Sequence, residues 1–397
     1  MSDNKLHIVH LGISGFPIGF GGIQRLILLY KGLISAGASV TVINRKAFHD
    51  DNVSVKREGI FEGVSYVYTS LYVNKPKNFW VRRISDLVGS VREFKLLYQL
   101  KRKGKLDAGS VYITGLIWEL WYYRIISRVI GFPIVLSYVE YRSAIQERKG
   151  KGWQSWGDTV FDRAASKYTD GILPISEYLM QVARQQSPKT PSLKVPVIQD
   201  FTRFNVPSTL NGHRKHFLYV GAATYTELIL FVLKAFSLVK ADMELHMVLG
   251  GHPRHLEKVY TFLEEHPKKE LIKIFNNVSD EEIPRKMANA SALLIPLRPT
   301  IQDEARFPHK VGEYVASGRP LITCNYGEIQ HYFKDGDTAL VAAAYDERLF
   351  ADKMQYVSIH PKEAKAIGKR GKELGQRLFD YKAHGKALRN FIETLRS

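Results

Sequence analysis

The sequence predicts an α/β protein made of two doubly wound domains that face each other across a cleft. Apolar strand patterns alternate with helical patterns along the chain, which is typical of parallel sheets covered on both faces. A polar, proline-bearing stretch from Gln199 to His216 interrupts the alternation and indicates a linker. The length of 397 residues suits two domains at roughly 150 residues each, with a remainder.

The first domain is expected to begin with a βαβ unit. A strand from Leu6 to Leu11 leads through the glycine-rich segment Gly12 to Gly22 into a helix from Ile23 to Ser35, and a second strand follows from Ser39 to Ile43. The runs that predict its later strands are Ser110 to Ile113, Ile134 to Tyr138 and Gly171 to Pro174. Between the first two of these, the aromatic segment around Trp118 to Ile130 predicts a helix.

The alternation restarts after the linker and predicts a second sheet. Its expected strands are Phe217 to Val220, Leu245 to Leu249, Ile272 to Phe275, Ala292 to Pro296 and Leu321 to Cys324. Its expected helices are Thr226 to Val239, Glu281 to Ala290, His309 to Ser317 and Glu328 to Phe333. We therefore expect an amino-terminal domain over 1–205, a second domain over 206–375, and a carboxy-terminal helix over 376–397 that packs back on the first domain.

The composition is that of an ordinary globular protein. With 45% hydrophobic and 24% charged residues, the chain is neither a disulfide scaffold, a disordered chain nor a collagen-like fibre. The single cysteine, Cys324, indicates a reducing cytoplasm. Met1 to Val9 does not resemble a secretory signal, and charged residues interrupt the apolar region from Val111 to Val139. These features predict a cytoplasmic protein, soluble or peripheral on the inner face of the cell membrane.

The formal net charge of +18 biases the surface towards polyanions. Between Lys75 and Lys105 there are ten basic residues and only two acidic ones, Asp86 and Glu93, interleaved with apolar and aromatic side chains. This pattern has three interpretations: a basic helix face exposed to solvent, a surface that contacts an anionic membrane, or a surface that contacts nucleic acid. No recognisable nucleic-acid-binding module occurs in the chain, so nucleic acid is not expected as a partner.

The first candidate site is Gly19-Phe20-Gly21-Gly22, directly before the first predicted helix. Glycines allow backbone amides to approach an anion, and the amino terminus of a helix adds partial positive charge. The spacing differs from the dinucleotide-binding fingerprint. An ordinary strand-to-helix turn explains the glycines equally well.

The most informative segment runs from Arg306 to Pro320 and leads into an apolar strand. Proline can open a helix and Gly318 can end it. In such a helix Lys310 and Glu313 lie on one face, where they could hold phosphate oxygens and ribose hydroxyls respectively. The alternative for these two residues is a solvated salt bridge.

The run FPHKVGEYVASGRPLIT, followed by Gly327-Glu328-Ile329, resembles the donor-site signature of family 4 glycosyltransferases of the GT-B fold. It is especially similar to the pattern P-x-K-x-x-E-Y-x-A-x-G-x-P of bacterial surface-polysaccharide enzymes. Three further segments resemble this family: Gly21-Gly22 with the helix and GASVTVI after it, Ile175-Ser176-Glu177-Tyr178, and Tyr219-Val220-Gly221.

This resemblance implies two Rossmann-like domains and transfer of a sugar from a nucleotide sugar to a glycan or polyprenyl-linked acceptor. The expected reaction retains the anomeric configuration, needs no metal, and belongs to capsule, exopolysaccharide or O-antigen biosynthesis. By resemblance, Glu313 binds the nucleotide ribose. The resemblance also places Gly21, Gly22 and Gly221 near the diphosphate or acceptor. The second glutamate of the family pair falls on Ala305, and Asp303 or Glu304 could take its place by a local shift. The loop that contains Gly251 is expected near the nucleotide.

The chain departs from the family pattern where the diphosphate should bind. Ala222 and Glu227 stand where the family has an arginine and a lysine, and Glu140 lies near the place of the usual acceptor-side histidine. Glu140 is a candidate for catalysis or, alternatively, a partner of Arg142. Arg306, Lys310 and Arg298 offer replacement charge, and we expect Arg306 or Lys310 to stabilise the leaving diphosphate. The lost cations also leave open a catalytically silent homologue that binds a nucleotide or glycan as a partner subunit.

Overall fold

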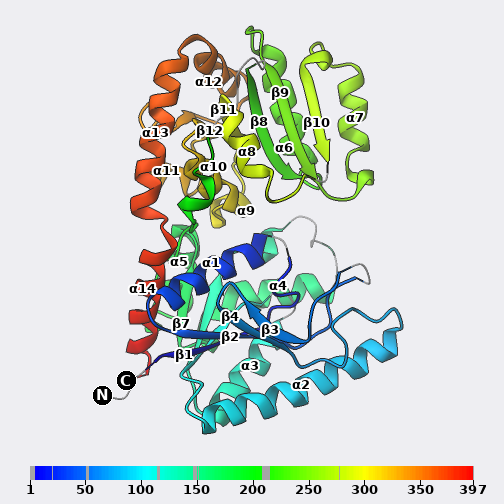
Figure 1. Cartoon of the computed structure of the whole chain (residues 1–397), viewed down its shortest axis with the longest axis vertical. Helices are drawn as coiled ribbons and strands as arrows, with labels where there is room; N and C mark the ends of the chain where they lie inside the picture. The colour runs from blue at the N-terminus through cyan, green and yellow to red at the C-terminus, as the bar shows by residue number, and fades with distance from the viewer. Residues whose placement is uncertain are drawn as a thin grey trace. The chain divides into compact units, whose positions relative to one another are not determined.

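The computed structural model describes residues 5–19, 21–50, 53–113, 117–145, 150, 152–207, 215–276 and 278–396. The chain forms two compact units (Figure 1). Unit 1 consists of Met1–Ile198 together with Tyr381–Ser397, and unit 2 consists of Gln199–Asp380.

Unit 1 contains a seven-stranded sheet of order β3-β4-β2-β1-β5-β6-β7. Its strands are β1 (His7–Leu11), β2 (Ser39–Asn44), β3 (Glu58–Phe61), β4 (Val64–Tyr68), β5 (Ala108–Val111), β6 (Ile134–Tyr138) and β7 (Gly171–Pro174). All neighbours pair in parallel except β3, which pairs antiparallel with β4 at the edge. Strands β4 to β7 are buried or half-buried along their length, as expected for strands covered on both faces.

The helices of unit 1 cover both faces of this sheet. They are α1 (Gly21–Ser35), α2 (Phe79–Arg102), α3 (Ile117–Ile130), α4 (Trp153–Ala164), α5 (Glu177–Gln186) and α14 (Tyr381–Thr394), with two short 3-10 helices, η1 (Arg142–Ala144) and η3 (Ala165–Tyr168). Helix α1 lies on one face, and α2 and α3 lie on the other (Figure 1). Among the described residues, none of the helices combines the length and the apolar character that a membrane crossing needs.

Two glycines bring α1 and α14 into close contact. A Cβ atom on Gly32 would overlap the carbonyl oxygen of Tyr381, and a Cβ atom on Gly385 would overlap the backbone of Gly32. Leu388 and Ile392 of α14 are each 1% exposed and join the same core cluster as Tyr30. The end of the chain therefore completes the core of the unit that its beginning forms.

Unit 2 contains a six-stranded, fully parallel sheet of order β10-β9-β8-β11-β12-β13. Its strands are β8 (His216–Ala222), β9 (Glu244–Gly250), β10 (Ile272–Asn276), β11 (Ala292–Ile295), β12 (Leu321–Cys324) and β13 (Leu340–Ala342). The helices are α6 (Thr226–Leu238), α7 (Glu257–Glu264), α8 (Ile283–Asn289), α9 (Ile301–Ala305), α10 (His309–Ser317), α11 (Ile329–Tyr332), α12 (Glu347–Ile359) and α13 (Pro361–Leu378), with short 3-10 helices η4 (Phe201–Phe204), η5 (Pro253–His255) and η6 (Lys269–Leu271).

The unit boundaries lie at 198/199 and 380/381, whereas the sequence interpretation placed them at 205/206 and 375/376. The first shift arises because part of the expected linker packs in unit 2: Phe201 and Phe204 are buried, and η4 contacts α10. The second arises because α13 continues past 375 to Leu378. Gly375 lies inside that helix, against Val315 and Phe201.

Candidate functional site

The strand order of unit 2 reverses between β8 and β11, which are direct neighbours. In doubly wound sheets, ligands bind beyond the carboxyl ends of the strands at such a switch point. Gly221 and Ala222 end β8, and Arg298 follows the end of β11 by three residues. The segment with the strongest functional signal, α9 and α10, comes directly after β11. The most informative part of the sequence therefore lies at the expected ligand-binding edge.

Arg298 is held at this edge by two carboxylates. Its Nε and Nη2 atoms donate to the two oxygens of Asp303, each at 3.1 Å, and its backbone N–H donates to Asp303 at 2.8 Å. Its Nη1 atom donates to Glu227 Oε2 at 3.0 Å. Burial opposes the charge of Arg298, but the bonds with Asp303 and Glu227 outweigh it, so its pKa lies above the usual range.

Asp303 also holds Arg306. The Nη2 atom of Arg306 lies 2.6 Å from Asp303 Oδ1, and its Nη1 atom donates to the Tyr225 hydroxyl at 3.0 Å. The guanidinium also stacks over the Tyr225 ring, 5.1 Å from its centroid. Asp303 is fully buried. One buried carboxylate thus gathers two guanidinium groups from the loop after β11.

The second cluster lies on α10, which begins after Pro308 and ends at Gly318 with a left-handed φ of 73°. The Lys310 ammonium donates to Glu313 Oε2 at 2.6 Å, and His309 Nε2 lies 3.6 Å from Glu313 Oε1. Glu313 is buried, which favours its neutral form, but Lys310 and His309 outweigh burial and lower its pKa. This carboxylate is therefore ionised and its oxygens can accept hydrogen bonds.

Helix α10 is fixed against the end of β8. The backbone N–H of Val220 donates to the Tyr314 hydroxyl at 2.9 Å, and Tyr314 is fully buried. Because Val220 immediately precedes Gly221, this bond joins the helix that carries Glu313 to the glycine end of β8. Sequence reasoning missed this role of Tyr314 and the role of Tyr225, since each joins segments distant in the chain.

The remaining donor-side candidates lie on neighbouring loops. Glu304, next to Asp303 on α9, accepts a hydrogen bond from the Tyr326 hydroxyl at 3.0 Å. Gly251 follows β9 with a φ of 129°, and a Cβ atom there would lie 3.4 Å from that of Ala223. The Ala223 N–H donates to the Gly250 carbonyl at 2.7 Å, so the loops after β8 and β9 adjoin.

The acceptor-side candidates belong to unit 1. A cavity of about 80 Å³ lies at the carboxyl ends of β5 and β6, and the residues that line it are Tyr112, Ile113, Ser137, Tyr138, Val139, Glu140, Arg142 and Phe161. Gly21 and Gly22 begin α1, and a Cβ atom on Gly22 would lie 3.5 Å from the Tyr112 hydroxyl. Tyr112 therefore connects the glycine turn with the cavity that Glu140 lines.

The loop that carries Glu140 is held by buried acids of α4. Asp162 accepts the backbone N–H groups of Arg142 at 3.0 Å and Ser143 at 2.6 Å. Arg142 is buried over the Phe161 ring, and its Nε atom lies 3.3 Å from Asp158 Oδ1. The ion pair with Asp158 therefore holds Arg142, one of the residues that line this cavity.

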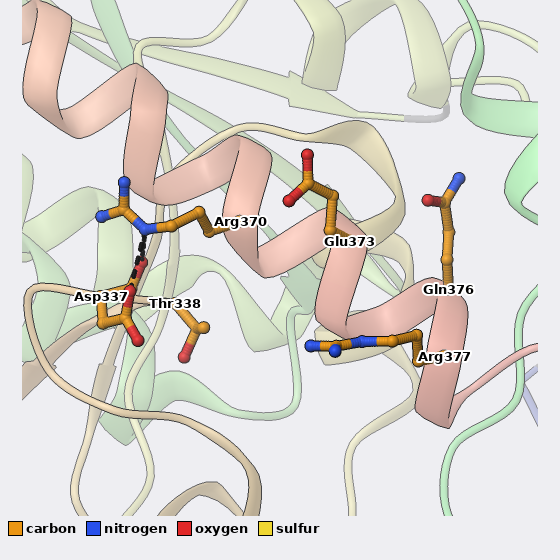
Figure 2. Close-up of a pocket in the computed structure, with 6 residues that line it drawn as sticks. All are labelled: Asp337, Thr338, Arg370, Glu373, Gln376 and Arg377. Carbon is orange, nitrogen blue, oxygen red and sulfur yellow. Dashed lines mark hydrogen bonds and ion pairs between the residues drawn. The ribbon is translucent and has the colours of Figure 1, made fainter.

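Another cavity, of about 520 Å³, lies elsewhere on unit 2. Figure 2 shows its lining, in which Arg370 of α13 bonds to Asp337 at 2.9 Å and Glu373, Gln376 and Arg377 extend from the same helix. Asp337 and Thr338 precede β13 and therefore lie at the amino ends of the parallel strands. The candidate residues lie at the opposite edge, so this cavity is not part of their site. Within the described ranges, no group of three or more His, Cys, Asp and Glu residues is arranged to hold a metal ion.

Comparisons with known proteins agree with this geometry. Residues 200–374 match the family model of glycosyl transferases group 1. The structure is similar to a sucrose-phosphate synthase from Thermosynechococcus elongatus, with a TM-score of 0.77 and 16% identity over 98% of this chain and 99% of that one. A glycosyltransferase from Rickettsia africae has a TM-score of 0.71 and 14% identity over 99% of each chain.

HepE from Anabaena in complex with UDP is also similar, with a TM-score of 0.71 and 11% identity over 98% of this chain and 100% of that one. No curated protein matches the chain. The structural likeness confirms the predicted fold, GT-B with two Rossmann-like units. The family match over most of unit 2 supports a glycosyltransferase, and the neighbours support the fold alone.

Proposed function

We propose that this protein transfers a sugar from a nucleotide-sugar donor to a glycan or lipid-linked glycan acceptor in the biosynthesis of a bacterial surface polysaccharide. The observation that carries this proposal is the pair of guanidinium groups that Asp303 holds beside the switch point of unit 2. Paired guanidinium groups suit a diphosphate, because they concentrate positive charge and N–H donors where its oxygens would lie.

In this proposal unit 2 binds the donor. The ionised Glu313 accepts hydrogen bonds from the ribose hydroxyls, with Glu304 as a second carboxylate close by. Gly221 and Gly251 allow the nucleotide to approach the backbone. Arg306 and Lys310, supported by Arg298, stabilise the charge that develops on the leaving diphosphate. These three side chains supply positive charge that a metal ion would otherwise provide, so we propose a reaction independent of metal.

The acceptor is proposed to bind unit 1, beside Gly21, Gly22 and Glu140. The small cavity at the ends of β5 and β6 supports this, because the Glu140 carboxylate and the Ser137 hydroxyl can accept hydrogen bonds from sugar hydroxyls there. No protein nucleophile is evident among these residues. A front-face displacement with retention, assisted by the leaving phosphate, is the mechanism that the family resemblance favours.

Thermal shifts with nucleoside diphosphates test the donor site. HepE is described in complex with UDP-glucose, so uridine diphosphate is tested first, followed by the guanosine, cytidine and adenosine diphosphates, each with and without Mg²⁺. We expect one of them to stabilise the wild type without metal, and Glu313→Ala to abolish the shift. Glu363→Ala, an exposed site on α13, is the control. No response to any nucleotide would contradict the proposal.

The outward face of α2 supports a contact with an anionic membrane surface in the Lys75 to Lys105 region. Six apolar residues recur along it at intervals of three and four and are exposed: Trp80, Ile84, Leu87, Val91, Phe94 and Tyr98. Exposed Arg83, Lys95 and Arg102 flank this stripe on the helical wheel, whereas Glu93 is buried beneath the helix. An apolar stripe between cations is typical of helices that lie in a membrane interface.

Co-sedimentation with liposomes tests this contact. We expect binding that increases with the fraction of anionic lipid and that Leu87→Glu weakens several-fold, because it places a carboxylate in the middle of the stripe. Gln99→Glu adds the same charge to the exposed helix surface away from the stripe and is the control. Binding that does not depend on anionic lipid, or no binding, would contradict the membrane contact.

The second candidate function is that of a silent subunit that binds a nucleotide or glycan without turnover. It is favoured by Ala222 and Glu227, which replace the cations of the family pattern. Nucleotide binding that depends on Glu313, together with neither donor hydrolysis nor transfer by the wild type, would support this alternative. A full transfer rate in the Arg306→Ala and Lys310→Ala variants would instead contradict the role of these two residues at the diphosphate.

A further inference from the structure

Glu227 forms an ion pair with Arg298 at the switch point of unit 2. Two of the three nitrogens of the Arg298 guanidinium group, Nε and Nη2, face α9 and donate to Asp303. The third, Nη1, faces α6 and donates to Glu227 Oε2 at 3.0 Å. Asp303 and Glu227 thus accept hydrogen bonds from different sides of the Arg298 guanidinium group.

The two carboxylates differ in how firmly they are held. Asp303 is fully buried and binds both Arg298 and Arg306. The Glu227 side chain is 61% exposed, and Arg298 is the cation it pairs with in the described part of the chain. Removal of Asp303 would leave two buried charges without their partner, whereas the Glu227 carboxylate can move into water and remain solvated.

The position of Glu227 coincides with the expected place of a bound anion. Glu227 lies in the first turn of α6, and a short loop joins this helix to the glycine end of β8 at the switch point of the sheet. Backbone N–H groups at the start of a helix attract anions there. An oxygen of a carboxylate or of a phosphate can accept the hydrogen bond that Nη1 donates.

We propose that Glu227 is a displaceable occupant of the donor site. It pairs with Arg298 while the site is empty, and the diphosphate of the ligand takes its place on Nη1. This inference rests on the proposed function and extends it. A ligand without a phosphate does not compete with the carboxylate, so Glu227 weakens the binding of a nucleoside diphosphate and leaves the binding of the corresponding nucleoside unchanged.

Calorimetric titration of Glu227→Gln with the nucleoside diphosphate that binds the wild type tests this role. Glutamine keeps the shape of the side chain and removes its charge. An exposed ion pair is weak, so we expect binding to become about two- to fivefold tighter. The affinity for the nucleoside alone should not change. Glu257→Gln, an exposed site in the first turn of the neighbouring helix α7, is the control for a general change in charge.

The Glu227→Asp variant tests whether the effect of Glu227 comes from its ion pair with Arg298 or only from its negative charge. Aspartate keeps the charge but is one methylene shorter, so it pairs less well with Arg298 and should also bind the diphosphate more tightly than the wild type. Equal gains in Glu227→Gln and Glu257→Gln, or a gain in Glu227→Gln with none in Glu227→Asp, would overturn the displacement. Binding that neither variant tightens would overturn it as well. No nucleotide binding by the wild type would instead overturn the proposed function, and this inference with it.

Discussion

Lys310 and Glu313 form an ion pair of 2.6 Å within one turn of α10, and the carboxylate of that pair is buried. This ion pair determines whether Glu313 is ionised or protonated when a ligand binds. Burial alone would raise the pKa of Glu313, and Lys310 is the strongest of the cations that lower it below 4.5 instead. The lysine therefore keeps the carboxylate a hydrogen-bond acceptor at neutral pH.

The first prediction concerns the pH dependence of nucleotide binding. In the wild type, binding through Glu313 should be lost only as the pH falls below 4.5, because the folded pKa lies below that value. In Lys310→Met the pKa rises, so the loss should begin at a higher pH. Titrations of affinity against pH measure the two midpoints. Lys362→Met, an exposed site on α13, should keep the wild-type midpoint. An unchanged midpoint in Lys310→Met would contradict this account of Glu313.

The second prediction concerns Asp303, which holds Arg298 and Arg306. Asp303→Asn leaves two largely buried guanidinium groups without their shared carboxylate, which should lower the free energy of unfolding by about 3–5 kcal/mol. Denaturant unfolding of unit 2 measures this loss. Asp352→Asn changes an exposed aspartate of α12 and should cost less than about 0.5 kcal/mol. Equal stability of the two variants would show that Asp303 does not organise the arginines.

The pair on α10 and the network around Asp303 differ in how far the sequence could predict them. Lys310 and Glu313 share a face because of the helical period, so their proximity follows from local sequence. Arg298 could be named as a replacement cation, but its partner Glu227 lies 71 positions away. That contact depends on the order of β8 and β11, which the alternation of elements does not specify. The antiparallel strand β3 was missed for a related reason, since exposed residues at a sheet edge carry a weak pattern.

The third prediction concerns the crossing of α1 and α14. Gly32→Ala would force the two backbones apart and should destabilise the protein by about 1–3 kcal/mol or more. Gly22→Ala lies in the same helix, where a Cβ atom meets only ordinary contact, and should be neutral or slightly stabilising. Thermal unfolding compares the two variants. Equal effects would mean that the close approach of α14 contributes nothing to stability.

The fourth prediction concerns Glu93, a buried residue of α2. Its side chain lies on the buried face of the helix and accepts hydrogen bonds from the hydroxyl groups of Tyr122 at 3.0 Å and Tyr123 at 3.3 Å. Burial raises its pKa from 4.5 to about 7, although Arg45 opposes the shift. Between these values the folded state binds more protons than the unfolded state, so stability should fall by about 1.4 kcal/mol per pH unit as the pH rises.

Glu93→Gln removes this titration. Its free energy of unfolding should therefore decrease less steeply than that of the wild type between pH 4.5 and 7. Denaturant unfolding at several pH values gives both slopes, and their difference isolates Glu93 from the other titrating groups. Parallel slopes would contradict the raised pKa.

The return of the chain to unit 1 determines the order in which the two units can be completed during synthesis. Unit 2 is one uninterrupted stretch, whereas unit 1 lacks α14 until all of unit 2 has been translated. At about 5–20 residues per second, translation of unit 2 takes roughly ten seconds or more. For that time the side of α1 that Leu388 and Ile392 later cover stays open. Unit 1 is therefore begun before unit 2 but completed after it, and this apolar surface of the nascent chain stays uncovered in the meantime.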